Sequence, residues 1–370
     1  LGDVYKRQPP FGPAWFSSVM GTGILSNLLG QRVGAHPWLL APAAFLLVTG
    51  FALTAVYTAG YVRHRRSAAR ELPSERTLVP PVDPAWGTVS MGLLSIGSAL
   101  LTVGPLLGLP HGVAVALDSF LWWLGTGIGI VTNLMFLART LVKQGGTPVP
   151  PWGLAVVSPM VSATAGAVLL MHFTNPALQF VVLTLSFACF VIALATGAVI
   201  FTVTYLTHVK VSTLPTAIAI SSWIPLGVVG QSAAAAVAIA VASRLFLTPD
   251  ATPLAHATAA VYGLVMIAVA VPVVALATRL TIRGFHARMP FNPGWWALTF
   301  PIGTLALGGH LLDGLLREAS FPAGFLADAF RTLAPVAAFA GDASLLALCC
   351  TWTFCTVSSV RAVAAVRAHR

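Results

Sequence analysis

Charged residues are scarce in this sequence. Charged residues make up 8% of its 370 residues, whereas soluble domains carry about 25%. Hydrophobic residues make up 57%, and the mean hydropathy is +0.87. No water-soluble core absorbs that much apolar surface. The apolar runs are about twenty residues long or longer, which excludes the roughly ten-residue alternating strands of a membrane barrel. We therefore predict an all-α polytopic membrane protein.

Cysteine is also scarce. The four cysteines all lie inside apolar runs and lack the spacing of a zinc finger, so we interpret them as small packing residues and expect no metal and no cofactor. The sequence opens without a methionine, and we interpret residues 1–10 as an N-terminal tail or a cloning scar. Residues 11–365 are predicted to form a single transmembrane pore domain, followed by a short cytoplasmic C-terminal end at 366–370.

About ten membrane spans are predicted, each near the roughly 20 residues that cross a bilayer. Short connectors join them, so neighbouring spans should pack as antiparallel hairpins. The long basic stretch from Arg63 to Asp83 is interpreted as a loop. The predicted spans are 13–30, 37–62, 84–107, 113–141, 151–172, 177–206, 215–247, 253–280, 293–316 and 330–361.

Lysine and arginine are distributed unevenly between the two sides that these spans define. Of the 20 basic residues, 16 fall on the side of the termini, and only Arg32, Arg244, Arg317 and Arg331 fall on the other. The positive-inside rule then predicts cytoplasmic termini in a plasma (inner) membrane. The net charge of +10 is dispersed over loops, so it indicates topology and contact with the lipid bilayer. No nucleic-acid partner is expected.

The odd-numbered spans share a pattern. Four open on a proline close to a tryptophan, and span seven opens at Pro215. Eight residues further on, or ten in span seven, stands a residue that weakens a helix: Gly21, Gly92, Pro159, Pro225 or Pro301. Interrupted helices occur at membrane depth only where they line a cavity or are buried in protein. We predict five hairpins with quasi-five-fold symmetry around a central pore, odd helices inside, even helices facing lipid, and kinks at these five residues. The alternative is that membrane helices simply contain Gly and Pro.

One residue precedes each of these breakers, and the five form a predicted layer around the pore. They are Met20, Met91, Ser158, Ile224 and Phe300. Four are apolar and Phe300 is the bulkiest, and a bulky apolar ring at a narrow point blocks ions sterically and by dewetting. We predict that Phe300 is the gate and that the other four form the constriction. An ordinary packing role for Phe300 is the alternative.

The predicted inner helices offer neutral polar groups. Candidates for the pore lining are Thr22, Ser162, Gln231 and Thr304. Acidic residues number ten, and those within spans, Asp118, Asp313 and Asp342, lie towards the ends away from the cytoplasm. Cation pores usually display acidic rings, whereas hydrogen-bond donors and a positive potential at the mouth favour anions. The sequence therefore predicts transport of small anions and no enzymatic activity.

Three motifs stand out in the odd-numbered spans: Phe11–Phe16 with Val19–Ile24, Trp223–Gly227 with Gly230–Ser232, and Phe291–Ala297 with Thr299–Pro301. They resemble a known family, the tellurite-resistance/C4-dicarboxylate transporters, which include plant slow anion channels, the fungal malate permease and sulfite exporters. The resemblance implies ten helices around a central pore, a homotrimer with one pore per subunit, and a gating Phe on helix nine that corresponds to Phe300. Chloride, nitrate, sulfite, tellurite and dicarboxylates are the implied cargoes.

Two alternatives remain open. A proton-coupled dicarboxylate or sulfite carrier would need a titratable group in the path, and His310 or Asp313 would have to serve as a proton or substrate contact. These two residues, at i and i+3, also share a helix face as metal ligands do. With His172 and Asp342 they could form an intramembrane metalloenzyme site.

Overall fold

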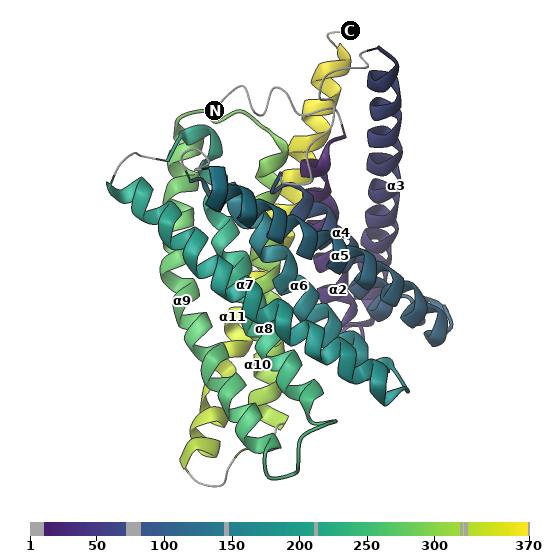
Figure 1. Cartoon of the computed structure of the whole chain (residues 1–370), viewed down its shortest axis with the longest axis vertical. Coiled ribbons are helices and arrows are strands. Elements are labelled where there is room, and N and C mark those ends of the chain that lie inside the picture. The colour runs from purple at the N-terminus through teal and green to yellow at the C-terminus, as the bar shows by residue number, and fades with distance from the viewer. Residues whose placement is uncertain are drawn as a thin grey trace.

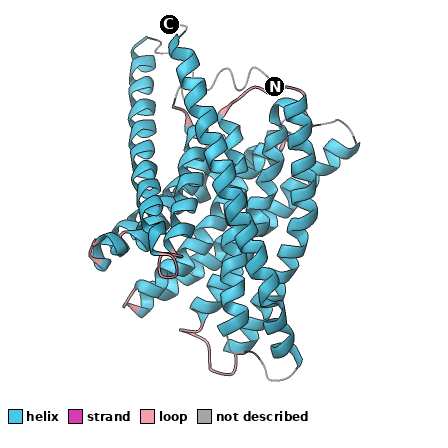
Figure 2. Ribbon diagram, turned by 180° about the vertical axis from the view of Figure 1, so that it is seen from behind, coloured by secondary structure: helices cyan, strands magenta, loops and turns pink. Residues whose placement is uncertain are grey.

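The computed structural model describes residues 11–71, 83–143, 148–210, 214–318, 321 and 325–368. The predicted tail at residues 1–10 lies outside these described residues. Throughout the described ranges the regular structure is helical, without strands, as Figure 2 shows. The predicted all-α polytopic class is confirmed. Eight of the helices are long and apolar enough to cross a membrane.

Short and long helices alternate along the chain (Figure 1). The last turns of α3 and α11 lie at the same end of the molecule in this view. The short helices are α2 (Phe16–Gly30), α4 (Trp86–Val103), α6 (Gly153–Leu169), α8 (Ile224–Ser243) and α10 (Phe300–Glu318). The long helices are α3 (Leu40–Glu71), α5 (His111–Lys143), α7 (Pro176–Lys210), α9 (Thr252–His286) and α11 (Phe325–Ala368).

The short helices form a closed ring. Each packs against the next in the order α2, α4, α6, α8 and α10, and α10 closes the ring by packing against α2. Each short helix also packs against the long helix that follows it, so the unit of the fold is a hairpin. Five hairpins around one axis is the arrangement that the repeat predicts.

Burial separates the two sets of helices. The most apolar stretches of α4, α6 and α8 are 83%, 83% and 78% buried, whereas those of α3, α5, α7, α9 and α11 are between 22% and 39% buried. Every residue of α2 is buried. The long helices expose large apolar side chains such as Phe45 and Phe339, and only lipid can solvate so many of them favourably.

Proline sets the start of the short helices. A 3-10 turn precedes α2 at Pro13–Trp15, α6 at Pro150–Trp152, α8 at Thr216–Trp223 and α10 at Pro293–Leu298. Proline fits a first turn because its missing N–H would have no intrahelical partner there. The two longer 3-10 segments, before α8 and α10, are the clearest departures from regular α-helix in the ring.

The interruptions differ from the predicted kinks. Pro225 and Pro301 stand in the first turn of α8 and α10, directly after a 3-10 segment, and so do not bend a helix at mid-length. Helices α2 and α4 continue through Gly21 and Gly92, and Pro159 lies within α6. Glycine costs a helix about 1 kcal/mol but removes no hydrogen bond, so a packed helix tolerates it. Gly21 instead allows a close approach, because a Cβ there would overlap the Thr299 side chain.

The basic stretch after Arg63 also differs from its predicted loop. Helix α3 continues into the first part of this stretch and reaches Glu71, and residues 72–82 lie outside the described part of the chain. Long apolar stems of arginine favour helix as much as leucine does, so the helix persists after its apolar part ends.

Candidate functional site

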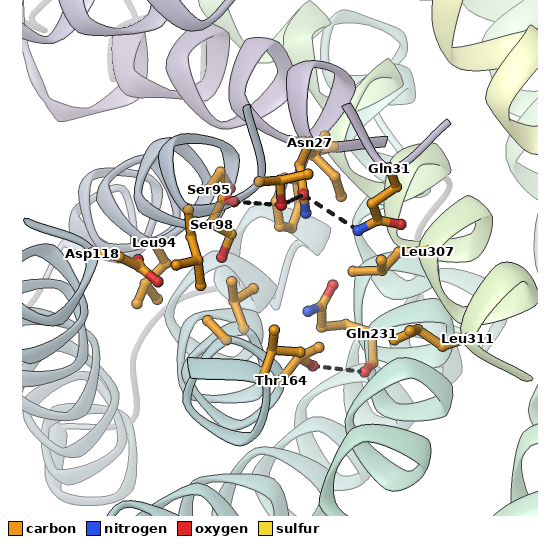
Figure 3. Close-up of a pocket in the computed structure, with 17 residues that line it drawn as sticks. Asn27, Gln31, Leu94, Ser95, Ser98, Asp118, Thr164, Gln231, Leu307 and Leu311 are labelled. Carbon is orange, nitrogen blue, oxygen red and sulfur yellow. Dashed lines mark hydrogen bonds between the residues drawn. The ribbon is translucent and has the colours of Figure 1, made fainter. Parts of the chain in front are cut away.

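A cavity of about 130 Å³ lies inside the ring of short helices (Figure 3). Such a volume holds several water molecules. All five short helices or their ends contribute to its wall, and α5 contributes one residue. The lining residues are Ile24, Asn27, Gln31, Leu94, Ser95, Ser98, Leu101, Thr102, Asp118, Val161, Thr164, Ala165, Val168, Gln231, Phe300, Leu307 and Leu311.

Phe300 lies at one end of this cavity. In α2, α4 and α6 the first lining residues, Ile24, Leu94 and Val161, come three or four positions after Met20, Met91 and Ser158. Phe300 is the exception, because it belongs to the predicted layer and also lines the cavity. Its side chain is 2% exposed and is among the largest of the fully buried side chains. The cavity therefore extends from Phe300 towards the C-terminal ends of the short helices.

The other four residues of the predicted layer do not border the cavity. Met20, Met91, Ser158 and Ile224 are all buried. The Ser158 hydroxyl donates a hydrogen bond of 2.6 Å to the hydroxyl of Ser90. These side chains fill space between helices, at a depth where the cavity has ended.

Most hydroxyl groups of the lining are engaged with the protein itself. Ser95 donates to the carbonyl of Met91 at 2.7 Å, and Thr102 donates to Asn27 Oδ1 at 2.7 Å. Thr164 makes longer contacts of 3.4 Å with the carbonyls of Met160 and Gln231. Since each hydroxyl has one proton to donate, these groups are poor donors to a ligand.

The hydroxyl group of Ser98 and the carboxamide groups are the neutral donors that remain. Gln31 uses one N–H to contact Asn27 Oδ1 at 3.3 Å, and its amide carries a second. The side chain of Gln231 extends among the lining residues in Figure 3, and its Oε1 atom is buried without a hydrogen-bond partner in the described part of the chain. A buried polar atom without a partner indicates a place for water or a ligand. Of the predicted polar lining residues, Gln231 is the one that the cavity contains.

The other three predicted polar residues lie elsewhere. Thr22, Ser162 and Thr304 are buried but do not line the cavity. Thr22 donates to the Ser18 carbonyl at 2.7 Å and accepts from Trp352 Nε1 at 2.9 Å. Thr304 donates to the Pro301 carbonyl at 2.6 Å. Hydroxyls on closely packed helices turn back to their own backbone in this way, which is why sequence position alone misplaced them.

His310 and Asp313 have different hydrogen-bond partners. His310 Nε2 lies 3.1 Å from Asp342 Oδ1, and both contact the guanidinium of Arg32. Asp313 Oδ1 accepts from Arg317 Nε at 2.6 Å. Neither His310 nor Asp313 lines the cavity.

The imagined metalloenzyme site is likewise not assembled. His172 pairs with His111, at 3.3 Å between ring nitrogens, and not with His310. Among the described residues no group of three or more His, Cys, Asp or Glu side chains is placed to hold a metal ion.

Sequence reasoning missed part of the lining. On α4, Ser95, Ser98 and Thr102 recur at three- and four-residue intervals, and at the end of α2 Asn27 and Gln31 are four residues apart. That spacing places each set on one helix face. Extending the face of the predicted layer by one to three turns would have found them. Asp118 gave no such signal, because it belongs to an outer helix.

The comparison with known proteins decides the family. Residues 10–360 match SLAC1, described as a voltage-dependent anion channel. The chain belongs to this family. This match confirms the family that the sequence motifs predicted. The SLAC1-family chain is therefore a multi-pass membrane protein of an anion-transporting family.

Curated relatives agree with that assignment. A sulfite efflux pump SSU1 of Arthroderma otae is 26% identical over 310 residues, which is 79% of each chain. The SSU1 pump of Trichophyton rubrum is 24% identical over 309 residues, again 79% of each chain. An uncharacterized transporter of Methanocaldococcus jannaschii is 24% identical over 327 residues, covering 85% of this chain and 86% of its own.

Proposed function

We propose that the cavity is part of a path for small anions and that the Phe300 ring closes the path at its inner end. The observation that carries the proposal is the position of Phe300, which is buried, lines the cavity and marks its end. An apolar ring at such a point excludes hydrated ions until it moves.

The lining supports a preference for anions. Its neutral donors include the carboxamide groups of Gln31 and Gln231, which both line the cavity. A carboxamide offers an anion its N–H groups without the permanent charge that would hold the anion too tightly to leave.

The named relatives make sulfite the first cargo to test, because SSU1 proteins are sulfite efflux pumps. Chloride, nitrate and C4-dicarboxylates are the further candidates. We also propose that the termini are cytoplasmic and that the membrane is the plasma membrane, since 16 of 20 basic residues lie on the side of the termini.

Reversal potentials in planar bilayers test the proposal. Purified protein is exposed to gradients of the potassium salts of chloride, nitrate, sulfite and malate in turn, so that the cation is the same in each measurement. We expect reversal potentials that follow the anion gradient and differ among the four anions. Potentials that follow the cation gradient would overturn the proposal.

A further inference from the structure

The cavity wall contains a single titratable side chain. Among the described residues that line the cavity, Asp118 is the one Asp, Glu, His, Lys or Arg. It is 2% exposed, and no hydrogen bond to its carboxyl group occurs within the described part of the chain. Figure 3 places Asp118 at the edge of the cavity, on the side of Leu94 and Ser98.

Close packing between α4 and α5 brings this carboxyl group to the cavity. Asp118 belongs to α5, an outer helix, and must pass α4 to reach the interior of the ring. It passes at Gly97, where an added Cβ would collide with Asp118 Oδ1. Without a side chain at position 97, the carboxyl group has room beside the α4 backbone.

In the part of the chain that the structure describes, no cation faces Asp118. Helices α4 and α6 pack against α5, and neither contains an Asp, Glu, His, Lys or Arg. On α5 itself His111 stands two turns earlier, where it pairs with His172 at the end of α6. Arg139 and Lys143 lie at the far end of α5. Across the cavity, His310 is engaged with Arg32 and Asp342.

In these surroundings, the charge on Asp118 determines whether an anion can occupy the cavity. An ionised carboxylate at the wall repels an anion in the cavity, and the low dielectric of the surroundings strengthens that repulsion. A protonated carboxyl group has no charge and donates one hydrogen bond. It then joins the carboxamides as a donor for the anion.

We propose that Asp118 is a proton-binding site that must carry a proton before an anion occupies the cavity. The proton comes from water at the cavity mouth and returns to that water, so Asp118 changes its charge without carrying a proton across the membrane. This inference rests on the proposed function and adds its regulation: acidification at the cavity mouth promotes anion passage.

The test measures anion flux into proteoliposomes at a series of pH values from about 5 to about 8.5, which spans the range where a buried carboxyl group changes charge. Chloride and sulfite are the probes. For the wild type we expect anion flux to rise about tenfold for each unit by which the pH falls, over part of this range. This slope is the one expected when a single group must be protonated. Asp118→Asn, a neutral isostere, should show the high flux of the protonated form at every pH.

Two variants control for indirect effects. Asp313→Asn removes a carboxylate that is paired with Arg317 outside the cavity, and it should keep the wild-type pH profile. Asp118→Glu restores a titratable group and should restore a pH profile. A wild-type profile in Asp118→Asn, or a flat profile in the wild type, overturns the proposal.

An infrared measurement separates this inference from the proposed function. Difference spectra across the same pH range should contain the carbonyl band of a protonated carboxyl group. The band should be missing from Asp118→Asn, and added anion should shift it in the wild type. Absence of the band in the folded wild type contradicts the proton site, whatever the flux. Presence of the band in a protein that passes no anion contradicts the proposed function instead.

Discussion

At the scale of single residues, the account depends first on Phe300. We predict that Phe300→Ala raises anion conductance in planar bilayers by about tenfold, because each 1.4 kcal/mol removed from a barrier is a factor of ten in rate. Truncating a buried Phe to Ala costs about 3–5 kcal/mol of stability, so the monodispersity of the purified variant must be checked beside its current.

Phe300→Leu provides a graded control, since leucine is apolar but smaller. It should give an intermediate conductance. Unchanged or lower conductance in well-folded Phe300→Ala would count against the gate and favour an ordinary packing role for the ring.

Gln231 is the second residue with a predicted effect. Hydrogen bonds to charged groups contribute about 1.5–3 kcal/mol, so Gln231→Ala should change permeability ratios among anions by about tenfold while expression stays near the wild-type level. Ser162→Ala is the matched control, because Ser162 is buried but lies outside the cavity. Loss of folded protein in Gln231→Ala would show that the side chain is structural.

Two of the lining residues, Phe300 and Gln231, could be predicted from sequence because each lies close to a breaker proline. Phe300 directly precedes Pro301, and Gln231 follows Pro225 by six residues. Thr22 and Thr304 were misplaced because helical periodicity does not say whether a hydroxyl turns to the cavity or to its own backbone. Asp118 could be recognised as an acidic residue within a span, but its place at the cavity could not be predicted. Its place depends on a contact between α5 and Gly97 of α4, which is information about tertiary packing.

At the scale of helices, α8 and α10 are held together by glycine. A Cβ added at Gly230 would lie 2.5 Å from Leu305 N and 2.7 Å from Thr304 C, both backbone atoms. Backbone cannot move aside as a flexible side chain does. We predict that Gly230→Ala destabilises the protein by about 1–3 kcal/mol, the usual range for overpacking, and lowers the thermal midpoint measured in detergent.

Gly127→Ala is the control at this scale. Gly127 also lies within a helix, α5, but an added Cβ there meets nothing within 4 Å. Alanine should be neutral or stabilising by up to about 1 kcal/mol, because it is the better helix former. Equal thermal midpoints for the two variants would contradict the close contact between α8 and α10.

The hairpin order could be predicted at this scale because the signal repeats five times. Apolar runs, short connectors and opening prolines all agree on where the helices begin, within a few residues. The form of the interruptions could not be predicted. A proline is compatible with a kink inside a helix or with the first turn of a new helix. In the structure, 3-10 segments at Thr216–Trp223 and Pro293–Leu298 precede α8 and α10, so Pro225 and Pro301 belong to first turns.

At the scale of the whole molecule, the cavity is complete within one chain, since one chain supplies all the residues described above as its lining. The family resemblance implies a homotrimer, and we predict that native mass spectrometry of detergent-purified protein gives three times the 38.5 kDa chain mass. Lipid-facing long helices supply apolar contact surface for such an assembly. A protein that is monomeric at concentrations where it transports anions would contradict the prediction.

The most direct measurement of the central claim is the chemical accessibility of the cavity. Ser98→Cys is introduced after the native cysteines are replaced by alanine, and a negatively charged thiol reagent is applied from the side opposite the termini. The account predicts that Ser98→Cys is modified, that modification blocks anion flux, and that the transported anion slows the reaction. Ser162→Cys should stay unmodified. Rapid flux through a protein in which Ser98→Cys is unreactive, or is modified without effect, would contradict the claim that anions cross through this ring of helices.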